Sequence, residues 1–404
     1  MIEKKSGTQI LISLILPVLL FKLIYSYIGV PFVQIKSGQG WQQLAISDNI
    51  TTILTYAVLM LIVFVFFYKA KDIKETSEIV FLLIALISAI VWFILDAWEL
   101  GAEDVIYSTS NIWGYVTILS FVIGFQKDLI QTIIKQCIPF AIILLVISII
   151  GYTQFSLQVS KGVLGNSQAL ISFIAAFWLF CIGSIYNLKA KKYPLLLIKI
   201  IAAIFPVMAL LFGARSWLIQ SVLWLFVYIY LEQSDKGLKK AGKIIFYSVA
   251  IALVLFFVVD SYFDLALTRM LDKGDTRTFQ YEQLFAQIDV WDLLVGQGQN
   301  FKYYQKGELY SYIDNGYLMV LMRYGVLVAI PYVACFIIPL LRAWKKRKEL
   351  GTNFGYAWII LMWLMALGGL SVYNMVIIDI KSIILSVVAG YLTMLCTEKK
   401  QEKN

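Results

Sequence analysis

Two arginines and an aspartate are the residues of this chain whose type and setting could do chemistry. Arg215 lies between two apolar runs, and Arg277 follows Asp275 at the start of a predicted helix. A guanidinium group binds a phosphate through two parallel hydrogen bonds, and the free N–H groups of a first helical turn add to the attraction for an anion. Arg215 is also explained by an interfacial side chain that reaches a lipid head group, and Arg277 by an ion pair with Asp275 or Glu282. Two anion sites are the first hypothesis.

Asp314 and Asn315 precede a long apolar run in the segment 312–318. Both residue types cap helices by accepting hydrogen bonds from free N–H groups, and this explains Asp314 without any chemistry. A carboxylate facing two arginines could instead accept a proton from an attacking hydroxyl group. The two roles are compatible, so Asp314 is a candidate base and a candidate cap.

Arg323 and a group of tyrosines surround these candidates. Arg323, about nine residues after Asp314, would lie on the order of 13 Å further along a straight helix. It could extend the anion site or pair with an internal acid such as Asp260 or Asp379, and pairing is our preferred interpretation. Tyrosine rings stack on sugar faces, but they also form belts at bilayer surfaces. The tyrosines concerned are Tyr281, Tyr303, Tyr304, Tyr310, Tyr312 and Tyr317.

The elements that must position these residues are membrane helices. Hydrophobic residues make up 60% of the chain and charged residues 15%, and the mean hydropathy is +0.80. A soluble domain cannot bury so much apolar surface, and a helix needs about 20 apolar residues to cross a bilayer. About twelve spans are predicted, at residues 9–30, 49–68, 79–97, 111–125, 137–155, 167–187, 195–212, 217–231, 244–260, 315–341, 356–373 and 376–395. We expect a single all-α polytopic membrane domain, 1–404, whose spans 195–212 and 217–231 form a hairpin with almost no loop.

The distribution of charge predicts the orientation of this bundle. Basic residues gather in alternate connections and at both termini, which places these parts in the cytoplasm. The net charge of +9 is thereby explained without nucleic acid as a partner. The chain has no histidine, and its four cysteines have no CxxC spacing, so neither a metal site nor a disulfide scaffold is expected. Phosphate-binding glycine motifs for nucleotides are missing, and no cofactor is expected.

One predicted outer connection, 261–313, between the ninth and tenth spans, differs from the others in length and polarity. Loops of this length in a compact protein are usually functional or disordered. Apolar residues in it recur at helical spacing, with Asp275 as a candidate N-cap and Gly296 as a candidate C-cap. We expect an amphipathic helix lying on the outer surface; its periodic residues are Tyr281, Leu284, Phe285, Ile288, Trp291 and Leu294.

The order of these motifs resembles the family of bacterial Wzy polysaccharide polymerases and O-antigen ligases. The resemblance covers the topology of the whole chain and the motifs between roughly Ala209 and Val328. In order, the motifs are Gly213-Ala214-Arg215-Ser216, Arg277, Gly296-Gln297-Gly298, Asp314-Asn315-Gly316-Tyr317-Leu318 and Arg323-Tyr324-Gly325. The resemblance implies a GT-C-like bundle that performs inverting, metal-independent glycosyl transfer at the outer face of the bacterial plasma membrane, with undecaprenyl-diphosphate-linked glycans as donor and acceptor.

Carried over residue by residue, the resemblance implies that Arg215 and Arg277 hold the donor diphosphate. Asp314 stands where the ligases have a histidine before asparagine, and this departure from the ligase pattern favours a polymerase. The related peptidoglycan polymerases of the shape and division family use an aspartate at a comparable outer site. Arg323, Asn315, Tyr317, Tyr312 and Tyr281 are the expected substrate-binding residues, and a chain-length regulator and a flippase are the expected partners. A ligase, or a flippase of lipid-linked oligosaccharides, remains the alternative.

Overall fold

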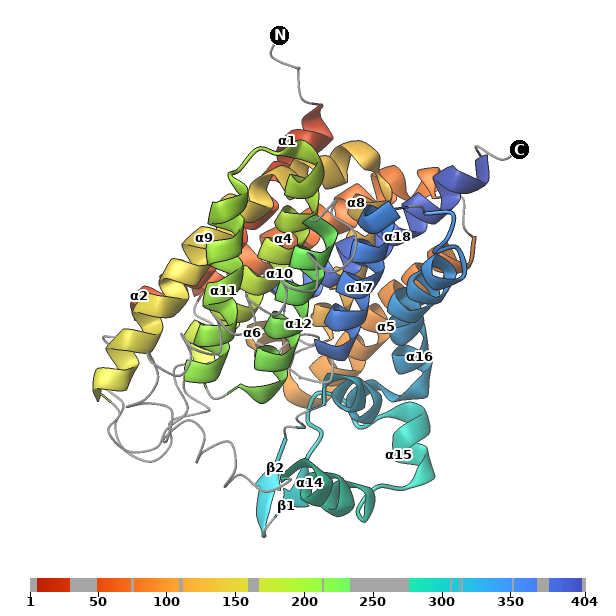
Figure 1. Cartoon of the computed structure of the whole chain (residues 1–404). Helices are drawn as coiled ribbons and strands as arrows, with labels where there is room; N and C mark the ends of the chain where they lie inside the picture. The colour runs from red at the N-terminus through yellow and green to blue at the C-terminus, as the bar shows by residue number, and fades with distance from the viewer. Residues whose placement is uncertain are drawn as a thin grey trace. The chain divides into compact units, whose positions relative to one another are not determined.

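A computed structural model of the chain describes residues 6–29, 49–73, 76–108, 112–158, 167–212, 214–232, 276–305, 307–311, 313, 315–350, 352–368 and 378–401. These residues are mostly helical and include one two-stranded hairpin (Figure 1). The helices are α1 (Gly7–Ser13), α2 (Ile15–Gly29), α4 (Asn49–Lys69), η1 (Ala70–Asp72), α5 (Thr76–Leu100), α6 (Ala102–Tyr107), α7 (Trp113–Val116), η2 (Thr117–Ser120), α8 (Phe121–Phe125), α9 (Lys127–Gln158), α10 (Ser167–Ala190), α11 (Leu195–Leu211), α12 (Arg215–Glu232), α14 (Thr276–Phe285), α15 (Val290–Val295), α16 (Gly316–Lys345), α17 (Thr352–Gly368) and α18 (Ile380–Gln401). The strands are β1 (Tyr303–Gln305) and β2 (Glu308–Tyr310).

The described helices are those of a membrane protein. Seven are long and apolar enough to cross a bilayer, at Gly7–Tyr25, Ile50–Lys69, Glu78–Leu100, Lys127–Tyr152, Ala169–Ala190, Gly316–Lys345 and Ile380–Thr397. Four shorter apolar segments are helical at Trp113–Phe125, Leu195–Leu211, Ser216–Leu231 and Phe354–Gly368. Together they overlap every predicted span except 244–260, which lies outside the described residues.

Contacts divide the chain into two compact units. The first unit contains residues 1–133, 276–350 and 365–404, and the second contains residues 134–275 and 351–364. Each unit is described by itself, and the expected single membrane domain stays a prediction.

The first unit is built around α18, which packs against α8 at a glycine-mediated crossing. A Cβ atom added to Gly124 would collide with the backbone of Val387, and one added to Gly390 would collide with the backbone of Phe121. Small residues let two helix backbones approach closely, which favours van der Waals contact where lipid removes the hydrophobic driving force. Ser120 of η2 adds a hydrogen bond to α18, because its Oγ donates to the carbonyl of Ile383 at 3.0 Å.

The predicted span 111–125 is helical from Trp113 to Phe125 but changes from α to 3-10 geometry in its middle. It consists of α7, η2 and α8, and all residues from Gly114 to Phe125 are buried. The hydroxyl of Thr117 donates to the carbonyl of Gly114 at 2.6 Å, which satisfies one backbone group near the irregular turn. Irregular backbone is tolerated at membrane depth where it is enclosed by protein, and its burial provides that condition.

Helix α16 bends sharply at Gly325, where φ is 70° and ψ is 178°. The bend separates a short first leg, which begins after the N-cap Asn315 and ends at Tyr324, from a long leg, Val326–Lys345. At roughly 1.5 Å per residue the long leg is about 30 Å long, enough to cross a bilayer by itself. Arg323 lies before the bend, in the leg that begins after Asn315, and its depth in a membrane stays a prediction.

The second unit contains the predicted hairpin of spans. α11 ends at Leu211 and α12 begins at Arg215, so the connection is as short as the sequence indicated. Aromatic rings fill the space between α10, α11 and α12: Phe177 packs against Phe205 at 5.4 Å, and Trp178 against Trp217 at 5.5 Å. These contacts make α10 the buried centre of this unit.

Candidate functional site

The polar segment, which we define as residues 276–311, is folded and belongs to the first unit. It contains α14, α15 and the antiparallel hairpin of β1 and β2, gathered together beyond one end of α5 and of the long leg of α16 (Figure 1). Gln280 Nε2 donates to the hydroxyl of Tyr303 at 2.8 Å, and Gln287 exchanges two bonds with the backbone of Tyr304. Buried Leu284 and Tyr303 give the segment a small core of its own.

The expected single surface helix is two helices. α14 ends at Phe285, and a new helix starts after Asp289, whose side chain accepts from the N–H of Asp292 at 2.9 Å while Asp292 Oδ2 accepts from the N–H of Asp289 at 3.0 Å. This reciprocal capping box stabilises a fresh N-terminus and so favours the break. Gly296 ends α15, as its C-cap position in the sequence indicated.

Arg277 is the second residue of α14, so the backbone places it in a first helical turn, as expected. Its side chain and Asp275 lie outside what the structure describes. Tyr281, one turn further along α14, is half-buried. The first-turn setting of Arg277 agrees with an anion site, and the geometry of its guanidinium group stays a prediction.

Two glycines join the polar segment to α16. Gly296 has φ 88° and ψ 167°, and Gly325 has φ 70° and ψ 178°, a region of backbone conformation that is essentially restricted to glycine. A Cβ atom on Gly296 would lie 2.5 Å from the carbonyl oxygen of Arg323, and one on Gly325 would collide with the backbone of Leu294 and Val295. The N–H groups of Gln297 and Gly298 then donate to the carbonyls of Met322 and Arg323, at 3.0 and 2.7 Å. The bend of α16 and the end of α15 thus fit each other backbone to backbone.

Asp96 on α5 binds the loop 296–300, which follows α15. It is 1% exposed, and its Oδ1 accepts from the N–H of Gln299 at 2.9 Å. Gly298 is also required here, because a Cβ atom on it would lie 2.6 Å from Asp96 Oδ1. Asn300 Nδ2 reaches Glu99 Oε1, one turn along α5, at 3.4 Å. The loop 296–300 is therefore fastened to both α5 and α16.

Arg323 lies buried in the first leg of α16, and its charge acts on Asp96. The sequence prediction named Asp260 or Asp379 as the acid near Arg323, and this pairing is not tested. Asp379 Oδ2 lies 2.9 Å from Lys381 Nζ. Asp260 lies outside the described residues.

Aromatic rings enclose this pair of charges. Tyr324 packs edge-on against Trp92 of α5 at 5.4 Å and against Tyr115 of α7 at 5.1 Å, and Tyr115 packs against Tyr332 at 5.0 Å. Among the described residues, the buried polar atoms that make no hydrogen bond include Oδ2 of Asp96, Oε1 of Gln299 and the hydroxyl of Tyr115.

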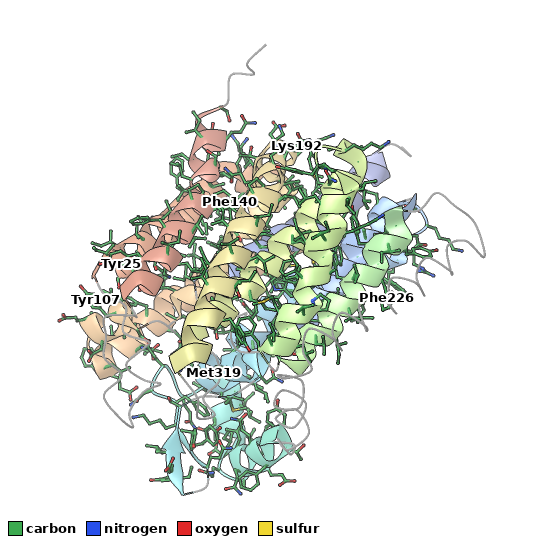
Figure 2. The ribbon with its side chains drawn as sticks, turned by 60° about the vertical axis from the view of Figure 1, so that its left-hand side comes forward. Tyr25, Tyr107, Phe140, Lys192, Phe226 and Met319 are labelled. Atoms are coloured by element: carbon green, nitrogen blue, oxygen red, sulfur yellow. The ribbon has the colours of Figure 1, made fainter. Side chains whose placement is uncertain are left out.

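The opening of α16 is a capped helix start. Asn315 Oδ1 accepts from the N–H groups of Tyr317 and Leu318, at 3.0 and 3.3 Å, so Asn315 is the N-cap. The hydroxyl of Tyr317 donates to the carbonyl of Ala366 at 2.7 Å. In Figure 2 the label of Met319 marks this first leg of α16 next to the polar segment. Tyr312 and Asp314 lie outside the described residues, so the role of Asp314 stays a prediction.

Arg215 belongs to the second unit, where it opens α12, and its side chain lies outside what the structure describes. The same helix carries buried polar groups at helical spacing: Gln220 and, one turn on, Trp224. Oε1 of Gln220 and Nε1 of Trp224 are buried without a hydrogen bond to any described residue. The expectation that Arg215 and Asp314 share one site is not tested.

Asp96 was not among the residues that the sequence singled out. The signal was present, because Asp96 falls inside the predicted span 79–97 and Arg323 inside the span 315–341, and opposite charges within spans usually pair. In the portion of the chain that the structure describes, no group of three histidine, cysteine, aspartate or glutamate side chains could hold a metal ion. Comparisons with protein-family models, with curated proteins and with solved structures found no match to this chain.

Proposed function

We propose that this protein joins lipid-linked oligosaccharide repeat units into a polysaccharide at the outer face of a bacterial plasma membrane. One observation carries the proposal: a folded polar segment is fastened by the Gly296–Gly325 contact and by Asp96 to the ends of membrane helices. Transfer between two lipid-linked substrates needs such a preorganised polar surface beside the bilayer, because both reacting groups are tethered to lipid. The motif order that resembles the Wzy polymerases and O-antigen ligases supports the same function.

In the proposed reaction a hydroxyl oxygen of the acceptor sugar attacks the anomeric carbon of the donor. The bond from that carbon to the diphosphate breaks with inversion, undecaprenyl diphosphate leaves, and the hydroxyl proton passes to Asp314. Arg215 and Arg277 hold the diphosphate and neutralise the charge that develops on it as the bond breaks. No metal ion or cofactor takes part.

The remaining candidate residues support this chemistry by position. Asn315 fixes the helix start next to Asp314, and Tyr317 fixes the same turn through its bond to Ala366. Arg323 accepts a hydrogen bond from the loop 296–300 through its backbone carbonyl, and its charge acts on Asp96. In the proposal it stabilises the position of this loop. Tyr281 on α14 and Tyr312 would contact sugar rings.

The proposal includes a topology of twelve spans with both termini in the cytoplasm and the polar segment outside. A chain-length regulator and a flippase for the repeat units are the proposed partners. The rival functions are transfer of a finished glycan to a different acceptor, which is a ligase reaction, and transport of the lipid-linked oligosaccharide without bond formation. The folded polar segment favours the two transferases over the transporter, a judgement based on architecture alone.

The test is to supply the purified protein, in vesicles, with one lipid-linked oligosaccharide and no other acceptor. A ladder of repeat multiples supports the polymerase. Absence of any product contradicts it and leaves the ligase, which a second acceptor such as a lipid-linked core glycan then reveals. Movement of the oligosaccharide across the vesicle membrane without a new bond identifies a transporter.

A further inference from the structure

Helix α15 presents apolar side chains that the protein does not cover. Five of its six residues are apolar, in the sequence Val-Trp-Asp-Leu-Leu-Val, and none of the six is buried. Val290 is 69% and Trp291 72% exposed, and Leu294 and Val295 are exposed beside them at helical spacing. A contiguous exposed apolar face with tryptophan at its centre is typical of a surface that binds lipid or protein.

The position of α15 in the first unit indicates which of these it binds. α15 packs against α16, and its carboxyl end meets Gly325, where the long membrane-crossing leg of α16 begins. The loop that follows is bonded to Asp96, one turn before the end of α5. Two independent spans therefore place α15 at the level where their membrane-crossing parts end, which is the bilayer interface.

The two spans that contact α15 and its following loop also expose apolar side chains close in sequence to those contacts. On the long leg of α16, Leu327 and Ile330 are exposed, and near the end of α5 Ile94 is exposed and Trp98 is 91% exposed. Tryptophan is enriched at membrane interfaces because its ring is apolar and its N–H group is polar. The two acids at the start of α15, the N-cap Asp289 and Asp292, each accept a hydrogen bond from the backbone N–H of the other in the capping box.

We propose that α15 is an interfacial anchor, with Val290, Trp291, Leu294 and Val295 inserted into the acyl-chain boundary of the bilayer. α15 has no lysine or arginine, so the attraction is apolar and does not depend on anionic lipid. The anchor fixes the base of the polar segment at the membrane surface. The inference does not rest on the proposed function, because it concerns only where α15 lies.

The test uses the full chain in vesicles of phosphatidylcholine and phosphatidylglycerol, with a nitroxide spin label on Trp291→Cys or Leu294→Cys. The four native cysteines are buried, so the unsubstituted chain serves as the control for labelling of other sites. Leu309→Cys is the matched reference, because Leu309 is an exposed apolar residue of the same polar segment on β2. All three substitutions replace exposed side chains and leave the core intact.

We expect the ratio of collisions with oxygen to collisions with a water-soluble nickel chelate to be several-fold higher at 291 and 294 than at 309. We also expect the ratio to stay the same when phosphatidylglycerol is omitted. Equal ratios at 291 and 309 overturn the proposal. A label at 291 that is immobilised and protected from both reagents also overturns it, because the face is then covered by protein.

Discussion

Two carboxylates of the first unit, the buried Asp96 and the half-buried Asp379, are held in different ways. Asp379 is bonded mainly within its own turn: its Oδ1 accepts from the N–H groups of Lys381 and Ser382, and its Oδ2 pairs with Lys381 Nζ at 2.9 Å. The charge of Lys22 on α2 also acts on it. Asp96 is satisfied by a partner 203 residues away in sequence, Gln299, and by the charge of Arg323. The first arrangement starts α18, and the second fastens the polar segment to the membrane helices.

The difference shows that one carboxylate stabilises the helix that it starts, whereas the other connects two regions that are distant in sequence. A carboxylate that caps its own helix stabilises that helix and little else. A carboxylate that binds a distant loop couples the position of that loop to the core. We therefore expect damage at Asp379 to stay local and damage at Asp96 to reach the loop 296–300.

The largest effect is expected for Asp96→Ala. It removes the carboxylate on which the charge of Arg323 acts and the acceptor of the Gln299 N–H group, and loss of one partner from a buried charge pair costs about 3–5 kcal/mol. Hydrogen–deuterium exchange should accelerate across residues 297–300. Asp379→Ala is the matched comparison, because it also strands a buried cation, Lys381. It should destabilise the protein by a similar amount but accelerate exchange at residues 381–382, and equal exchange at 297–300 in both variants would argue against the contrast.

Gly325→Ala should come next. The side chain strains the backbone by about 1–3 kcal/mol, and its Cβ atom also pushes against the backbone of Leu294 and Val295. Gly101→Ala is the control, because Gly101 also has a positive φ, 93°, but open space around its Cβ position. Exchange at residues 294–298 should rise in Gly325→Ala alone. If Gly101→Ala has the same effect, backbone strain and not the contact between α15 and α16 is responsible.

A smaller effect is expected for Ser382→Ala, on the local side of the comparison. Ser382 Oγ accepts from the N–H of Asp379 at 3.3 Å, and loss of one such bond lowers the free energy of unfolding by about 1 kcal/mol. The start of α18 should exchange faster, and the polar segment should be unchanged. A change at residues 297–300 in this variant would mean that the two carboxylates are coupled.

The smallest effect is expected for Glu99→Gln, on the long-range side. Glu99 is exposed, its contact to Asn300 Nδ2 is long at 3.4 Å, and glutamine keeps an oxygen that can accept. The free energy of unfolding should change by no more than about 0.5 kcal/mol. A loss as large as that of Asp96→Ala, measured by thermal unfolding, would shift the anchoring of the loop from Asp96 to Glu99.

Features that depend on neighbouring residues in sequence were predictable. The short connection between α11 and α12, the end of α15 at Gly296 and the first-turn position of Arg277 follow from apolar runs and capping residues. The positions of the spans follow from hydropathy for the same reason. These features need no knowledge of which helices lie side by side.

Features that depend on tertiary neighbours were not predictable. The bend of α16 at Gly325 exists because α15 packs backbone to backbone against it, and the charge of Arg323 acts on Asp96 because α5 lies next to α16. The division of one expected surface helix into α14 and α15 shows the same limit on a smaller scale. Helical spacing continued through residues 286–289, but the capping box of Asp289 started a second helix.

The central claim is that the polar segment binds the donor diphosphate for glycosyl transfer, and the elongation rate of purified Arg277→Ala tests it most directly. The rate is measured in vesicles with a single lipid-linked oligosaccharide, beside wild type and Lys302→Ala, which removes an exposed cation of the same segment. The account predicts a rate about 10²–10³-fold below wild type for Arg277→Ala and an unchanged rate for Lys302→Ala. A rate for Arg277→Ala equal to that of wild type would contradict it.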